Sequence, residues 1–153
     1  VLPQIKVREA AARFYIVGRS PTAAVLALAS DQVVVTGTVP DVRPYLQHAA
    51  AVVAPLRIAR GIQNKILEAM SMAKPVIASV ECAAAVDAAK GTELLTADNL
   101  AAYIAELARV LDAPAAAAAI GRAARQRVVE RYSWEAHLEA IDRYLPQARA
   151  LPQ

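Results

Sequence analysis

The sequence predicts an α/β fold of the Rossmann-like type, a doubly wound parallel sheet of about five strands with extra C-terminal helices. Short apolar runs recur along the chain, and each is followed by a segment with helical spacing or a helix-capping residue. These runs are predominantly apolar, which is typical of strands buried on both faces of a parallel sheet. After the last run the chain turns alanine-rich, which favours helices.

The five expected strands are bounded by glycine, proline or polar residues. They cover residues 13–17, 33–36, 51–54, 76–79 and 93–96. The first helix is expected over residues 1–12, and a second over 22–29, where Ser20 would cap and Pro21 would occupy the first helical position. A third, over 41–48, is entered through Pro40. The fourth carries an apolar face of Ile62, Ile66, Ala69 and Met70 and stops before Pro75.

Three further helices are expected after the last strand. Asp98 is expected to cap the first, over 99–111, and Pro114 begins the second, which runs through Arg131. Ser133 is expected to cap the third. An apolar stripe on that helix is interpreted as core, and it comprises Trp134, Leu138, Ile141 and Leu145.

Length and composition indicate one globular domain over residues 1–153. The chain is 57% hydrophobic and 20% charged, which argues against disorder. No apolar run approaches the ~20 residues that cross a bilayer. The single cysteine, Cys82, excludes an internal disulfide and fits a reducing, cytoplasmic compartment. His48 and His137 are far apart, so histidine metal-ligand spacing is absent.

The distribution of charge favours an anionic ligand. Between Val33 and Lys65 the only acid is Asp41, against four basic residues. Nucleic acid is not expected as a partner, because aromatic residues total 5% and no basic run carries interleaved aromatics. Four arginines precede the last expected helix and could contact a membrane surface or form a solvated face; they are Arg122, Arg125, Arg127 and Arg131.

One stretch runs from Pro55 to Ser79 and has the sequence PLRIARGIQNKILEAMSMAKPVIAS. Its pattern predicts a strand end, a basic loop, a helix, a turn and a second strand. On its helix Gly61, Lys65 and Glu68 share the face opposite the isoleucines. A helix N-terminus with basic residues nearby and a carboxylate on the same face suits an anionic ligand that bears hydroxyl groups, such as a sugar nucleotide.

Three motifs together resemble the C-terminal, nucleotide-binding half of two-domain (GT-B) glycosyltransferases, family 4 (group 1) in particular. They are the segment from Gly37 to Pro40, the core KILEAMSMAKPVIAS of residues 65–79, and the segment from Tyr132 to Glu135. The resemblance runs from about Phe14 to Leu145. It is strongest to the sugar transferases of bacterial exopolysaccharide and exosortase systems.

The resemblance implies specific roles in binding the donor, a UDP-sugar or a GDP-sugar, with no other cofactor. The Glu68 carboxylate would accept hydrogen bonds from the ribose hydroxyls. The turn from Gly61 to Asn64 would place main-chain N–H groups against the diphosphate, and Lys65 would either reach the diphosphate or pair with Glu68. The expected donor-binding residues are Glu68, Lys65, Asn64, Gln63, Ile62, Gly61, Arg60, Val39, Pro40, Gly18 and Arg19.

The sequence departs from the family pattern at two positions. Arg60 stands eight residues before Glu68, where the family has a glutamate that faces the donor sugar. A cation there could hold the diphosphate or an acidic sugar. Ala73 stands just after the helix, where the family usually has glycine, and it would cost roughly 1 kcal/mol if its backbone is left-handed.

The expected function is retaining, metal-independent transfer of a sugar from a nucleotide-diphosphate donor to a glycan or lipid-linked acceptor in bacterial polysaccharide synthesis. Domains of this class open with a strand, whereas this chain opens in a helix, so an N-terminal domain and the first strand are expected to be missing. The chain alone is expected to be inactive, and any catalytic residues would lie in the missing half. The alternatives are a nucleotide-sensing or protein-docking module and a sugar-nucleotide epimerase.

Overall fold

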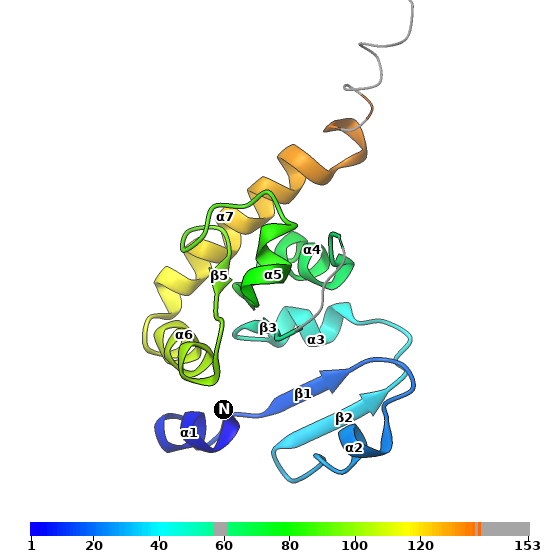
Figure 1. Cartoon of the computed structure of the whole chain (residues 1–153), viewed down its shortest axis with the longest axis vertical. Helices are drawn as coiled ribbons and strands as arrows, with labels where there is room; N and C mark the ends of the chain where they lie inside the picture. Colours follow the sequence, from blue (N-terminus) through cyan, green and yellow to red (C-terminus); the bar gives the residue numbers. More distant parts are fainter. Residues whose placement is uncertain (57–60, 137, 139–153) are drawn as a thin grey trace, which may run out of the picture.

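The computed structural model describes residues 1–56, 61–136 and 138, and these residues form seven helices and five strands. Their order along the chain alternates between the two types until β5, after which only helices follow (Figure 1). The elements are α1 (Leu2–Arg8), β1 (Phe14–Val17), α2 (Ala23–Leu26), β2 (Val33–Gly37), α3 (Arg43–His48), β3 (Val52–Ala54), α4 (Asn64–Ser71), β4 (Val76–Ala78), α5 (Val80–Ala84), β5 (Leu95–Thr96), α6 (Leu100–Asp112) and α7 (Pro114–Tyr132). The predicted α/β class is confirmed.

All strand pairs are parallel, as the uninterrupted apolar runs predicted. The strands form two hydrogen-bonded groups, β1–β2 and β3–β4–β5. Phe14 lies opposite Val33 in the first group, and Ile77 lies between Val53 and Leu95 in the second. The expected strand over 93–96 forms only at its last two residues.

The core lies around the second group of strands. β4 is fully buried, and α4 covers it with Ile66, Ala69 and Met70. A second cluster on the other side joins Ile77 to α6 and α7. Because α4 is buried along one face and exposed along the other, its exposed face is available for function.

Helix α7 closes the core by running across the end of α4. Gly121 packs directly on the carbonyl group of Ala73 in the turn after α4, and the Arg125 guanidinium donates to the carbonyl oxygen of Ser71. Further along, Arg127 donates to the Glu93 carboxylate, with Nε and Oε2 3.0 Å apart. The α4–β4 turn is therefore held from outside by a helix about fifty residues later.

The expected helix starts were wrong at two positions by one or two residues. Thr22, not Ser20, is the N-cap of α2, and its side chain accepts from the Val25 amide. Ser20 instead takes a positive φ of 47° in the preceding turn. Asn99, not Asp98, caps α6 by accepting from the Ala102 amide.

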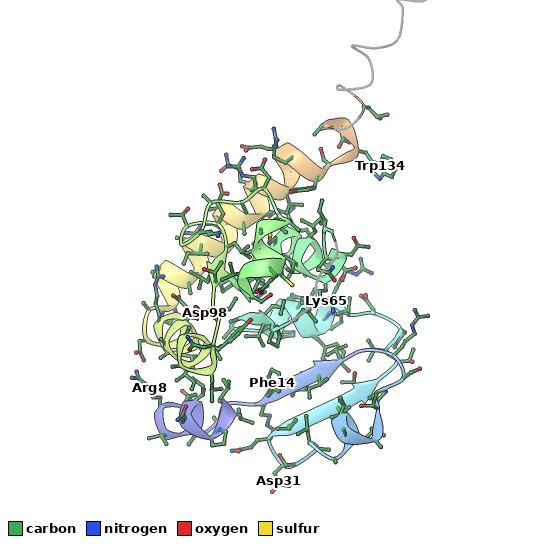
Figure 2. The ribbon with its side chains drawn as sticks, viewed as in Figure 1. Arg8, Phe14, Asp31, Lys65, Asp98 and Trp134 are labelled. Atoms are coloured by element: carbon green, nitrogen blue, oxygen red, sulfur yellow. The ribbon has the colours of Figure 1, made fainter. Side chains whose placement is uncertain are left out.

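The interpretation of the last apolar stripe as core was also wrong where the structure describes it. Trp134 is 81% exposed and Leu138 is 52% exposed. Figure 2 shows the Trp134 ring pointing away from the rest of the molecule. Ile141 and Leu145 lie outside the described residues. Helical spacing predicts which residues share a face of a helix, but it does not predict whether another part of the protein packs on that face.

In the described part of the chain, no helix is long and apolar enough to cross a membrane.

Candidate functional site

The candidate site is built on the segment that leaves β3 and enters α4. Gly61 takes a positive φ of 68°, and Gln63 then adopts an extended conformation as the N-cap residue. The helix begins at Asn64, so Gly61 and Ile62 lie in the turn before it, not on its first helical turn. Ile62 is 45% exposed and does not continue the buried stripe of Ile66 and Met70 as expected.

The N-terminus of α4 carries no side-chain cap among the described residues. The Gln63 side chain donates to the carbonyl oxygen of Gly61 and does not accept from the first helical turn. The first amides of a helix have no partner within the helix, so this end presents N–H groups and a partial positive charge. Among the described residues, no atom lies within 4 Å of a β-carbon added to Gly61.

Glu68 lies one turn into α4 on its exposed face, at a surface hollow of about 300 Å³. The hollow lies between α4 and the segment that begins α3. It is lined by Asp41, Val42, Arg43, Leu46, Glu68, Ser71 and Met72. The structure thus brings Glu68 next to the loop that follows β2, although about thirty residues separate them in sequence.

An ion pair between Asp41 and Arg43 forms the opposite wall of the hollow. Arg43 Nε lies 3.0 Å from both carboxylate oxygens of Asp41, and the Arg43 amide also donates to Asp41 Oδ1 at 2.9 Å. These hydrogen bonds from Arg43 hold the pKa of Asp41 below its ordinary value, and the Asp41 carboxylate raises the pKa of Arg43. The pair is therefore fully ionised near neutral pH, and it fixes the start of α3.

The other expected residues lie at the ends of neighbouring strands. Gly18 and Arg19 follow β1, and Val39 and Pro40 follow β2. The Gly18 amide donates to the carbonyl oxygen of Gly37, which holds the two strand ends together. None of these four residues lines the hollow beside Glu68.

Lys65 is exposed in the first turn of α4 (Figure 2), and no ion pair joins it to Glu68 in the described part of the chain. Of the two alternatives for Lys65, pairing with Glu68 is therefore not the one that the described residues show. Arg60, which the sequence also placed at this site, lies outside the described residues.

Sequence reasoning missed the lining residues that the entry and start of α3 contribute. Asp41 and Arg43 were not among the expected donor-binding residues, yet both line the hollow with Glu68. Ser71, at the end of α4, lines it too and was also not expected. One local signal was present, because an Asp two residues before an Arg, next to proline, is typical of an Asx-turn at a helix start. The packing of α3 against α4 gives no such signal.

Comparison with known proteins shows the family to which this chain belongs. The model of the family described as "Glycosyl transferases group 1" matches residues 1–113, which include β1 to β5 and the whole α4 site. Among solved structures, the one titled "Crystal Structure of TarM" matches with a TM-score of 0.73 at 20% identity. The match covers 91% of this chain but only 30% of that chain. No match was found among curated proteins.

Proposed function

The chain belongs to the group 1 glycosyltransferase family, and from that premise we propose that it is the donor-binding half of a two-domain (GT-B) enzyme. It binds the nucleoside diphosphate part of a UDP-sugar or GDP-sugar at α4. The binding site for the sugar acceptor and the catalytic groups on the acceptor side lie in an N-terminal domain outside this chain. The matched solved structure is much longer than this chain, which covers 30% of it, and this is compatible with further domains in a longer polypeptide.

The observation that carries the proposal is that α4 presents an uncapped N-terminus and a carboxylate on the same exposed face. Asn64 begins the helix and Glu68 follows four residues later, about 6 Å further along the axis. One nucleoside diphosphate spans that separation, with its diphosphate at the amides and its ribose at the carboxylate. An ionised carboxylate has two oxygens, which suits it to accept from both hydroxyls of a ribose.

The same end of α4 stabilises the group that leaves when the sugar is transferred. Negative charge develops on the diphosphate as the glycosidic bond breaks, and fixed dipoles aimed at that charge lower the barrier. The N-terminal amides of α4 and the Lys65 ammonium supply this stabilisation. Arg60 belongs to the same proposal as a further cation, in place of the carboxylate that the family carries at that position.

Around the α4 site, the main-chain atoms of Val39 and Pro40 contact the base. Gly18 and Arg19 form a turn at the edge of the donor cleft. Retention of the anomeric configuration, independence from metal ions and a glycan or lipid-linked acceptor complete the proposal. These features and a role in exopolysaccharide synthesis rest on the sequence resemblance. A cytoplasmic or peripheral membrane location rests on the single cysteine and on the four arginines that precede the last expected helix.

The test is a calorimetric titration of the chain with UDP, GDP and their sugar conjugates. One of these nucleotides is expected to bind saturably. Glu68→Gln keeps the size of the side chain but removes the charge, so it should weaken binding about tenfold, equivalent to ~1.4 kcal/mol. Glu135→Gln, which changes an exposed glutamate beyond α7, is the matched control and should bind like the unchanged chain.

Two outcomes would contradict the proposal. One is nucleotide binding that Glu68→Gln leaves unchanged. The other is a folded protein that binds no nucleotide sugar, both as this chain and within its longer polypeptide. Retention and metal independence are tested on the longer polypeptide, by NMR of the product's anomeric proton and by turnover in the presence of a chelator.

A further inference from the structure

Glu81 and Tyr103 lie at one edge of the sheet, and neither was among the expected donor-binding residues. The strands β3, β4 and β5 are parallel, so their carboxyl ends share this edge. Glu81 follows the end of β4 and lies in the first turn of α5. Tyr103 lies near the start of α6, which follows β5. The carboxyl edge of a parallel sheet is where ligands of open α/β domains bind.

The Tyr103 ring comes from one face of the sheet, and its hydroxyl reaches the end of β3. The ring packs on the cluster around Ile77, whereas α5 belongs to the cluster around Ile66 on the other face. The Tyr103 hydroxyl donates to the carbonyl oxygen of Ala54, the last residue of β3, with 3.5 Å between the two oxygens. A hydrogen bond of this length is weak, so an oxygen of a ligand competes with it easily.

The Glu81 side chain is exposed and lies close to Tyr103. Burial raises the pKa of the Tyr103 hydroxyl, and charge on Cys82 and Glu81 raises it further. The hydroxyl is therefore protonated at neutral pH and is available as a donor. Within the described part of the chain, no hydrogen bond or ion pair occupies the Glu81 carboxylate. A hydroxyl that donates and accepts, beside a carboxylate that accepts, suits a ligand with several hydroxyl groups.

The direction in which the proposed donor runs along α4 leads to this edge. Its proposed ribose contact is Glu68, and its proposed diphosphate contact is the N-terminus of α4 at Asn64. The sugar is attached to the far end of the diphosphate, so it lies beyond that N-terminus. A helix that connects two parallel strands starts where the first strand ends, so this end of α4 lies at the carboxyl edge. Neighbouring strands are ~4.8 Å apart, so the end of β4 is within reach of a sugar at the end of β3.

We propose that Glu81 and Tyr103 bind the sugar of the donor, and that Glu81 selects an uncharged sugar over an acidic one. Tyr103 donates to a sugar oxygen, and the Glu81 carboxylate accepts from sugar hydroxyls. A uronic acid would bring a second negative charge next to Glu81, and like charges repel strongly where water is partly excluded. The inference rests on the proposed function, because the sugar reaches this edge only if the diphosphate binds at α4.

Asp98 is a second carboxylate at this edge and provides a matched comparison. It follows β5, which β4 separates from β3. The Asn99 side chain donates to it, with Nδ2 and Oδ1 2.7 Å apart. A charge after β5 lies about one strand spacing further from the end of β3 than a charge after β4. Selection against an acidic sugar should therefore depend on Glu81 and only weakly on Asp98.

Calorimetric titration with UDP, UDP-glucose and UDP-glucuronate tests the selection, or with GDP, GDP-mannose and GDP-mannuronate if guanosine is the base that binds. For each variant the affinity for the sugar conjugate is divided by its affinity for the free diphosphate, which isolates the contribution of the sugar. In the unchanged chain this ratio should be about tenfold higher for the uncharged sugar than for the acidic one. Glu81→Gln keeps the shape and removes the charge, so it should reduce the preference to about twofold or less. Asp98→Asn should keep most of the preference.

Tyr103→Phe tests the second contact, because it keeps the ring that packs in the core and removes the hydroxyl. Its ratio should fall about fivefold for both sugar conjugates, with the preference between them retained. Tyr132→Phe is the matched control. The Tyr132 hydroxyl accepts from the Asp87 amide at 2.8 Å, so its removal should lower the unfolding midpoint and leave both ratios as they are.

Two results would overturn the sugar subsite. One is a preference for the uncharged sugar that is absent from the unchanged chain or that survives in full in Glu81→Gln. The other is a pair of ratios that Tyr103→Phe leaves unchanged. Failure of the proposed function looks different, because UDP and GDP would then not bind or Glu68→Gln would leave their binding unchanged. The two failures are therefore distinguishable.

Discussion

The backbone of Gly121 lies so close to the carbonyl group of Ala73 that a β-carbon at position 121 would come within 2.7 Å of the carbonyl carbon. Alanine normally stabilises a helix interior by ~1 kcal/mol relative to glycine. At this position overpacking against backbone costs ~1–3 kcal/mol and should outweigh that gain. We expect Gly121→Ala to lower the free energy of unfolding by up to ~2 kcal/mol, measured by urea denaturation. A more stable variant would contradict this contact.

Ala73 itself occupies the left-handed region, with a φ of 55°. From the sequence we expected Ala73 to cost roughly 1 kcal/mol if its backbone was left-handed. That condition is met. Ala73→Gly should raise the free energy of unfolding by ~0.5–1 kcal/mol, because glycine adopts this conformation without a clash. Ala118→Gly, at an exposed position inside α7, is the control and should lower stability by a similar amount. Loss of stability in both variants would count against the assigned backbone.

The Glu93–Arg127 pair predicts acid sensitivity. Burial raises the pKa of Glu93, but the hydrogen bonds from Arg127 and the Ala89 amide outweigh burial and hold the pKa below the ordinary value of 4.5. Because the folded-state pKa is lowered, the contribution of Glu93 is complete above 4.5 and is lost as the pH falls through the folded-state value. Urea denaturation across this range should show stability falling toward acid.

Glu93→Gln should remove this part of the pH dependence. Its free energy of unfolding at neutral pH should be ~1–2 kcal/mol lower, because a partly buried charged hydrogen bond is lost. Glu135→Gln, outside this contact, should keep the full pH profile. An unchanged acid profile in Glu93→Gln would show that other groups cause the loss.

Glycine is expected to be favoured at position 61 because of its left-handed backbone conformation and not because of a lack of space for a side chain. Its φ of 68° is unfavourable for residues with a β-carbon, although no atom of the described residues would clash with one. Gly61→Ala should therefore cost ~1 kcal/mol of stability. Gly61→Asn should cost less, because asparagine tolerates the left-handed region. Thermal unfolding of the two variants ranks them, and equal stability of all three proteins would contradict the assigned turn.

The fold was predictable to the extent that it follows from local pattern. The apolar runs that form β1 to β4 are continuous and bounded by turn residues, so their period and length were enough to predict strands there. The cap of α6 was assigned one residue early because Asp98 and Asn99 are adjacent and both can cap a helix. The exposure of Trp134 was not predictable, since it depends on which surface meets the stripe.

The candidate site was predictable on α4 and not beyond it. Glu68 was placed on the exposed face by helical spacing, and the structure has it there. Its proximity to Asp41 and Arg43 depends on how α3 packs against α4, and no sequence period encodes that contact. The donor-binding roles of Glu68 and Lys65 stay predictions until a nucleotide titration tests them.

The reliance of α4 on α7 has a consequence during synthesis. The buried face of α4, with Ile66 and Met70, shares a cluster with Ala124, and Arg125 binds Ser71 across 54 residues of sequence. At the usual rate of translation, roughly 3 to 11 s pass between the emergence of these two regions from the ribosome. During that interval β4, which follows α4 directly in sequence, can already pack on Ile66 and Met70, but the part of the cluster that Ala124 completes stays open. The core around α4 is therefore finished only after α7 has emerged.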